Sequence, residues 1–174
     1  MILSTNNKTN KRMENENKLV RHPTDNITYK VIGLAMEVHK RLGPGLKEEM
    51  YQKAMEELLG KSGLNFEAQK QIEVYFSDRL VGLLFIDILV ERSIVVELKA
   101  LSHYLTNNEI AQVITYLKAE GADVGLLINF GRKYLEYKRI FPPKKIKEFS
   151  MKDLRFGIRL DAEHLKRMNN KYIR

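Results

Sequence analysis

The sequence contains no cysteine, which excludes disulfide bonds, thiolate nucleophiles and metal sites built on cysteine. It also has no apolar run that approaches the roughly 20 residues of a membrane-spanning helix. The opening stretch, MILSTNNKTNKR, lacks the apolar segment of a secretory signal peptide. The phosphate-binding loop pattern with its lysine is absent as well. From these absences we expect a cytoplasmic protein that does not enter a membrane.

The charge that is present is unevenly distributed along the chain. Residues 138–174 carry twelve basic and four acidic side chains, whereas residues 27–137 carry thirteen basic and fifteen acidic ones. A basic segment beside a nearly neutral domain favours nucleic acid as a partner, although charge alone leaves a solubilising surface as the alternative. We therefore divide the chain into a polar, disordered tail over residues 1–25, a domain over 26–141 and a basic extension over 142–174.

The spacing of apolar residues predicts an α/β fold in which helices flank a small mixed sheet. Three strands are expected to form an antiparallel meander, and a helical crossover to return a fourth strand. The stretch LVGLLFIDILV is almost wholly apolar, which predicts a central strand covered on both faces. The expected elements are helices 27–42 and 46–63, strands 66–76, 80–90 and 93–100, a helix 107–120, a strand 123–130 and a short edge strand 134–141.

Two carboxylates interrupt the apolar strands of FIDILVERSIVVELKA, residues 85–100. A turn centred near residue 92 places Asp87 opposite Glu97, with Cβ atoms about 4.5–5.5 Å apart. Alternation along a strand places Lys99 on the same face as Glu97. Opposed like charges destabilise a sheet, and burying each costs several kcal/mol unless it is compensated. Lys99 can offset one negative charge, whereas a divalent cation would offset both.

These groups have the chemistry of a metal site. The carboxylates of Asp87 and Glu97, with the backbone carbonyl of Leu98 between them, form a hard oxygen site suited to Mg²⁺ or Mn²⁺. Such an ion can activate a water molecule and neutralise a phosphoryl group, and Lys99 could orient that water or stabilise the transition state. The alternatives are a buried ion-pair network, or a register that turns one carboxylate to solvent.

These residues and their spacing resemble those of a known family. The pattern D-x9-E-x-K on adjacent strands between two helices resembles the PD-(D/E)XK nuclease superfamily. More narrowly, GLKEEMY resembles the signature of the GxxExxY proteins, with Gly45, Glu48 and Tyr51 in the signature places. The stretches EVHKRLGPGL, IDILVE, VVELKA, AQVITYLK and GLLINF extend this resemblance over roughly residues 27–141. Ile86 departs from it, since the superfamily name has proline there.

The resemblance implies a restriction-endonuclease-like core of α-β-β-β-α-β order, here with an additional N-terminal helix. By position, Asp87 and Glu97 correspond to the metal-binding acids and Lys99 to the catalytic lysine. Glu48 corresponds to a further acid that the first core helix sends toward the metal. Gln112 corresponds to a polar group on the following helix near the catalytic site.

Several of these residues also have simpler interpretations. Glu48 would stabilise its helix as an acid in the first turn, where the helix dipole favours negative charge. Gln112 and Tyr116 are spaced i, i+4 and would lie on a solvated helix face. Tyr51, one turn after Glu48, is expected to serve packing rather than catalysis.

The sequence is compatible with two functions. The first is a Mg²⁺-dependent nuclease that hydrolyses phosphodiester bonds of DNA or RNA. The second is a catalytically inactive protein of the same fold that binds nucleic acid or regulates another process. The resemblance also raises a homodimer as an assembly to test.

Overall fold

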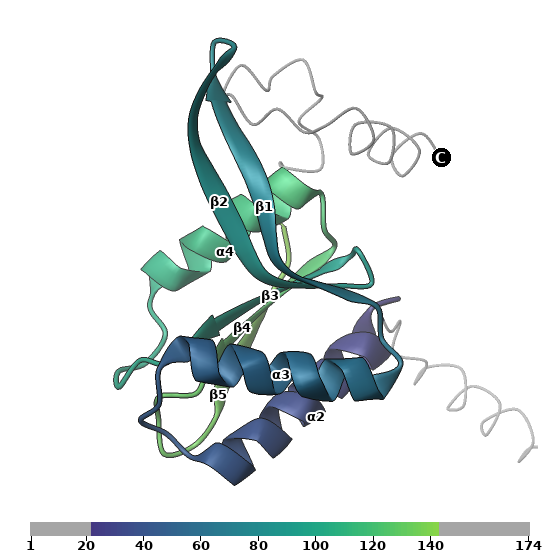
Figure 1. Ribbon diagram of the computed structural model, residues 1–174, viewed down its shortest axis with the longest axis vertical. Coiled ribbons are helices and arrows are strands. Elements are labelled where there is room, and N and C mark those ends of the chain that lie inside the picture. The colour runs from purple at the N-terminus through teal and green to yellow at the C-terminus, as the bar shows by residue number, and fades with distance from the viewer. Residues whose placement is uncertain (1–21, 143–174) are drawn as a thin grey trace, which may run out of the picture.

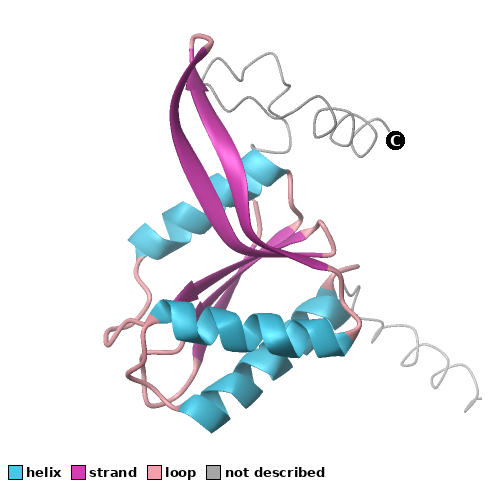
Figure 2. Cartoon of the chain, viewed as in Figure 1, coloured by secondary structure: helices cyan, strands magenta, loops and turns pink. Residues whose placement is uncertain are grey.

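The computed structural model of this protein describes residues 22–142, so most of the expected tail and extension lies outside the described residues. Within these residues two helices precede three strands, and a further helix precedes the last two strands, as the apolar spacing predicts (Figure 2). None of the helices in this part of the chain is both long and apolar enough to cross a membrane. The elements are α2 (Asp25–Leu42), α3 (Glu48–Ser62), β1 (Phe66–Phe76), β2 (Arg79–Val90), β3 (Ile94–Lys99), α4 (Asn107–Glu120), β4 (Val124–Asn129) and β5 (Glu136–Ile140).

The helices begin and end where the local sequence favours it. At the start of α4, Thr106 Oγ1 accepts the Asn108 amide at 3.2 Å, and Glu109 Oε2 accepts the Thr106 amide at 2.7 Å. This is the capping box, which satisfies amides that have no partner inside the helix. α2 ends at Gly43, whose φ of 67° is a left-handed value that glycine adopts without steric cost. The short connection that follows leads to Glu48 at the start of α3.

The strands form one mixed sheet in the order β1-β2-β3-β4-β5. β1, β2 and β3 pair antiparallel, β4 runs parallel to β3 after the α4 crossover, and β5 returns antiparallel to β4. The order α3-β1-β2-β3-α4-β4, preceded by α2, is that of the expected core with its additional helix. The predicted α/β fold and the short edge strand are therefore confirmed.

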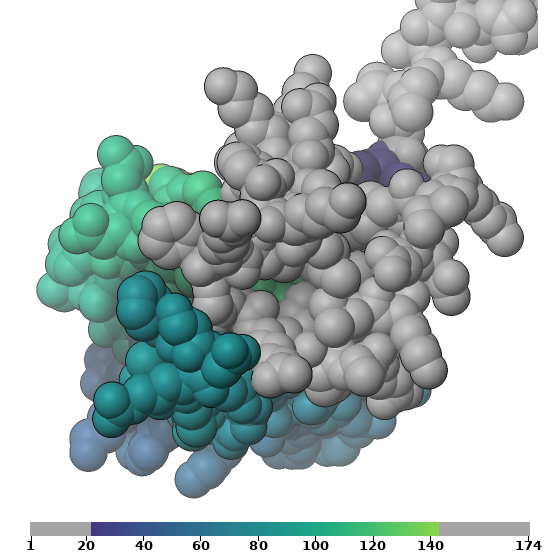
Figure 3. All heavy atoms as spheres, turned by 90° about the horizontal axis from the view of Figure 1, so that it is seen from above, coloured from purple at the N-terminus to yellow at the C-terminus, as the bar shows by residue number. Residues whose placement is uncertain are grey.

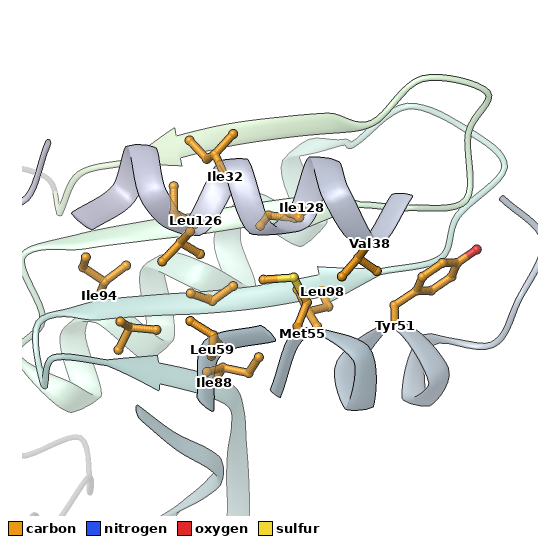
Figure 4. Packing of buried hydrophobic residues seen from close by; sticks show 14 of the residues in the cluster. Ile32, Val38, Tyr51, Met55, Leu59, Ile88, Ile94, Leu98, Leu126 and Ile128 are labelled. Carbon is orange, nitrogen blue, oxygen red and sulfur yellow. The ribbon is translucent and has the colours of Figure 1, made fainter. Parts of the chain in front are cut away.

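The helices lie in layers on the two faces of the sheet (Figure 1). α2 and α3 pack on one face and α4 on the other. Because side chains alternate along β3, Val96 packs beneath α2 and α3, whereas Val95 packs against α4. The same alternation turns Glu97 and Lys99 toward the α4 face. Figure 4 shows the core beneath α2 and α3, which includes Val38, Tyr51, Met55, Leu59, Ile88, Leu98, Leu126 and Ile128.

The first half of β2 is not covered on both faces, so that prediction is wrong for residues 80–85. Val81 is 58% exposed and Phe85 is 44% exposed. Gln69, with φ of 49°, and Asp87 interrupt the pairing of β1 with β2, and beyond them the hairpin leaves the sheet (Figure 1). In the view from above, the turn of this hairpin stands nearest the viewer (Figure 3). β3 is only six residues long and does not pair with the projecting half, so among the described elements it is α4 that packs against this half.

Candidate active site

The end of the β2–β3 ladder positions Asp87. The pairs Val90–Ile94 and Ile88–Val96 centre the turn on residue 92, as the sequence predicts. The pairing of β2 with β3 ends at Ile88 and Val96. Beyond this pair, Asp87 Oδ2 accepts a hydrogen bond from the Leu98 amide at 2.8 Å. The carboxylate thus contacts β3 at the point where β2 leaves the sheet. Burial raises the pKa of Asp87, while the Leu98 amide and the charge of Lys99 act in the opposite direction.

Glu97 is the most buried acid of this cluster, with 2% of its surface exposed. Its Oε1 lies 2.6 Å from the Nζ of Lys99, in an ion pair on the α4 face of β3. Its Oε2 is buried, and no hydrogen-bond donor within residues 22–142 reaches it. Burial and the charge of Asp87 raise the pKa of Glu97 to about 7, although Lys99 acts against this. A buried carboxylate oxygen without a hydrogen-bond donor is a candidate ligand for a cation.

Lys99 is the shared partner of several acids. Burial alone would lower its pKa, but the hydrogen bond and charge of Glu97, together with the charges of Glu48 and Asp87, raise it. One ammonium group therefore faces three carboxylates. Lys99 alone does not balance the charge of the cluster when all three acids are ionised.

Glu48 approaches the cluster from the other side of the sheet. It is the first residue of α3 and is half-buried. Burial and the charge of Asp87 raise its pKa, whereas Lys99 and a hydrogen bond with the backbone of Ala100 lower it. The helix-dipole interpretation does not account for these interactions at the end of β3. The structure brings Glu48 near Lys99 and Asp87.

Gln112 and Tyr116 lie on α4, where Gln112 Nε2 donates to the Tyr116 hydroxyl at 2.9 Å. Tyr116 is only 6% exposed, so the expected solvated face is wrong for this residue. Burial raises the pKa of its hydroxyl, and the charges of Glu97 and Asp87 raise it further. Tyr116 is therefore a neighbour of the acids that sequence reasoning missed. Its i, i+4 spacing from Gln112 was the available signal.

Gln69 is a second neighbour that the sequence did not reveal. Its Nε2 lies 3.4 Å from Asp87 Oδ1 and donates to Gln52 Oε1 at 2.7 Å. Gln52 is one helical turn after Glu48 on α3. These glutamines link the projecting hairpin to α3 beside the candidate site. The left-handed backbone conformation of Gln69 permits these contacts. The alternation of side chains along β1 gives no sign of this conformation.

Tyr51 has the packing role expected from the sequence. Its buried ring stacks on Phe130 with centroids 4.6 Å apart. Its hydroxyl donates to the Gly43 carbonyl at 2.7 Å and accepts the Leu46 amide at 3.2 Å. These contacts hold the start of α3 against the preceding turn, and so fix the position of Glu48.

The donor set fits a hard divalent cation with water in part of its coordination sphere. The Lys99 carbonyl accepts the amide of Phe130, the residue directly after β4, at 2.7 Å. Because carbonyl directions alternate along a strand, the Leu98 carbonyl is turned toward the Asp87 side. No three His, Cys, Asp or Glu side chains within residues 22–142 are arranged to hold a metal ion. The ligands that remain are the carboxylates of Asp87 and Glu97 and the Leu98 carbonyl. The buried Oε2 of Glu97 supports this fit.

Comparison with known proteins identifies the family. The family sequence model that describes the PD-(D/E)XK nuclease superfamily matches residues 25–140, from the first residue of α2 to the last of β5. The chain belongs to the PD-(D/E)XK nuclease superfamily. A search of curated proteins finds no match. The superfamily has the restriction-endonuclease-like fold, and its nucleases generally use divalent metal ions.

Proposed function

We propose that this protein is a Mg²⁺- or Mn²⁺-dependent nuclease that hydrolyses phosphodiester bonds of DNA or RNA. The observation that carries the proposal is the buried Glu97 Oε2, which lies in a cluster of acids around Lys99. Membership of the superfamily supports the class of reaction. The narrower assignment to the GxxExxY proteins is part of the same proposal and rests on Gly45, Glu48 and Tyr51.

Each residue of the cluster then has a role. Asp87, Glu97 and the Leu98 carbonyl would hold the ion, which when bound neutralises phosphate charge and lowers the pKa of a water molecule. Lys99 would orient the attacking water or stabilise the negative charge that develops on the phosphate. Because no group of three carboxylates is preformed among residues 22–142, Glu48 would act on the metal through a water molecule.

The α4 side of the site would be closed by Gln112. Its hydrogen bond to Tyr116 places a neutral donor and acceptor beside the acids, where it adds no further negative charge. Gln112 would thus help to position water or phosphate oxygens.

The proposal is tested by incubating the purified full-length protein with Mg²⁺ or Mn²⁺ and with single- and double-stranded DNA and RNA. We expect cleavage by the native protein, none by Asp87→Ala, and cleavage slowed by about a hundredfold or more in Lys99→Ala. Cleavage at the native rate in both variants would come from a contaminant and would contradict the assignment. Binding without cleavage of any of these substrates would favour the catalytically inactive alternative.

A further inference from the structure

A pocket rich in tyrosine and basic residues lies at the carboxyl ends of β3 and β4. Its volume is about 350 Å³, and it is formed by the loops that follow these two strands and by the start of β5. These loops lie at the end of the sheet where α3 begins (Figure 2). The aromatic and basic residues that line it are Tyr104, Tyr134, Tyr137, Arg132 and Lys133. None of them belongs to the cluster around Lys99.

The aromatic rings of this pocket are exposed to solvent. Tyr104 is 67% exposed, and the guanidinium carbon of Arg132 lies 3.1 Å from the centre of its ring. Tyr134 is 75% exposed, with the Lys133 ammonium 5.4 Å from its ring centre. Large exposed aromatic groups that cluster with cations are a typical surface for recognition. The cations hold the rings by cation–π contact and remain available to an anion.

Buried contacts hold the two loops in place. Asn129 is fully buried, and its Oδ1 accepts the amides of Leu101 at 2.9 Å and Gly131 at 3.0 Å. Its Nδ2 donates to the His103 carbonyl at 3.0 Å. The loops are in such close contact that a Cβ at Gly131 would lie 2.5 Å from the Leu101 backbone. The pocket is therefore preorganised, which reduces the entropy lost when a ligand binds.

Glu136, the acid in the pocket lining, already accepts a hydrogen bond within the protein. Its carboxylate oxygens each accept the Leu105 amide at 3.2 Å, and Lys138 Nζ donates to the Leu105 carbonyl at 3.1 Å. This arrangement reduces the repulsion that an incoming anion would meet. The pocket thus favours a ligand that combines a flat ring with negative charge.

The pocket is close to the candidate active site. Lys99 pairs with Asn129, which pairs in turn with Glu136 at the pocket. Since neighbouring strands lie about 4.8 Å apart, the Cα of Glu136 lies about 10 Å from that of Lys99. A strand stacked as in a duplex advances about 3.4 Å per nucleotide, so a more extended single strand covers this distance in about three nucleotides or fewer.

We propose that the pocket of Tyr104, Arg132 and Tyr134 binds an unpaired base of single-stranded nucleic acid a few nucleotides from the bond that is cut. This inference rests on the proposed nuclease function and names its substrate class. The base would stack on the tyrosine rings, and Arg132 and Lys133 would contact the adjacent phosphates. A duplex keeps its bases stacked against one another, so it would offer the pocket phosphates alone.

The test is the affinity of the full-length protein for fluorescein-labelled oligothymidine of about 12 nucleotides, and for a duplex of equal length. Anisotropy is measured in EDTA so that no strand is cut. Tyr104→Ala and Tyr134→Ala are each expected to weaken single-strand binding roughly tenfold and to leave duplex binding unchanged. Tyr104→Phe retains the ring and should bind like the native protein. Tyr29→Ala, which removes a 77% exposed tyrosine on α2, is the matched control.

A second variant separates stacking from charge. Arg132→Gln should reduce the dependence of single-strand binding on salt by about one counterion. Unchanged affinity in both tyrosine variants, with melting temperatures showing that they are folded, would overturn the pocket and leave the nuclease proposal standing. Tyrosine-dependent binding without cleavage of any substrate would support the pocket and count against the nuclease. An equal loss of single-strand and duplex affinity in the tyrosine variants would also overturn the inference.

Discussion

The α4 side of the sheet holds two pairs in which a lysine meets a buried glutamate. Lys99 Nζ lies 2.6 Å from Glu97 Oε1, and Lys70 Nζ lies 3.5 Å from Glu120 Oε1. The two glutamates are 2% and 6% exposed. As isolated ion pairs, both would have an ordinary structural explanation.

Their surroundings differ. Burial and the charge of Asp87 raise the pKa of Glu97, so a second, half-buried carboxylate adds negative charge to a cluster that has one lysine. Lys70 contacts Glu120 and also Glu67, which lies 3.2 Å away and is exposed to water. Water screens the charge of an exposed acid, whereas a buried acid must be offset by protein, proton or metal. The accumulation of buried and half-buried acids around a lysine, rather than the buried pair itself, therefore distinguishes the candidate site.

The largest expected difference is in cleavage rate, between a variant that lacks Lys99 and a variant that lacks Lys70. Lys99→Ala is expected to slow cleavage by a hundredfold to a thousandfold, because it removes the cation beside the developing phosphate charge. Lys70→Ala should lower thermal stability but leave the cleavage rate of the folded protein near that of the native one. Single-turnover cleavage in Mg²⁺ measures both rates. A folded Lys70→Ala protein as inactive as Lys99→Ala would remove the distinction between the pairs.

The second largest effect is expected in the pH dependence of stability, to which Glu97 and Glu120 should contribute differently. In metal-free protein the pKa of Glu97 rises from 4.5 to about 7 on folding, so the folded state binds its proton more tightly. This contribution to stability is complete below pH 4.5 and is lost as pH rises through 7, with a total of about 3 kcal/mol. Denaturant unfolding of Glu97→Gln should lack this fall, and Glu120→Gln should retain it. Parallel curves for the native protein and Glu97→Gln would contradict the assignment.

Metal binding should have a smaller effect on stability. At a Mg²⁺ concentration ten times the dissociation constant, the native protein should gain about 1.4 kcal/mol, and EDTA should reverse the gain. Asp87→Asn and Glu97→Gln should show no increase in melting temperature, because each removes a carboxylate ligand. Glu120→Gln should respond like the native protein. A metal-dependent shift that survived in both ligand variants would place the ion elsewhere.

The smallest effect is expected at Tyr116, whose hydroxyl accepts from Gln112 beside the acids. Tyr116→Phe removes one hydrogen bond, worth about 1 kcal/mol, which corresponds to about a fivefold reduction in cleavage rate. Tyr29→Phe on α2 is the control at an exposed tyrosine. Rates that are equal in both variants would show that the Gln112–Tyr116 pair only packs against the cluster.

Much of the cluster could be predicted because its geometry is local. Asp87, Glu97 and Lys99 lie within thirteen residues, and a turn centred on residue 92 with strand alternation suffices to bring them together. The capping box at Thr106 is equally local. The exposure of Val81 and Phe85 was not predictable in this way. An apolar run shows that a strand can be buried, but not that neighbouring elements extend far enough to cover it.

The sequence by itself determined the elements, their order and the β2–β3 register, because periodicity, caps and turns act over a few residues. Only the tertiary structure decided which distant residues join the acids: Glu48 from α3, Tyr116 from α4 and Gln69 at the bend of β1. It also brought Tyr104 against Arg132, since the parallel pairing of β3 with β4 places their following loops side by side. These contacts join residues far apart in the chain, and their geometry depends on how whole helices pack on the sheet.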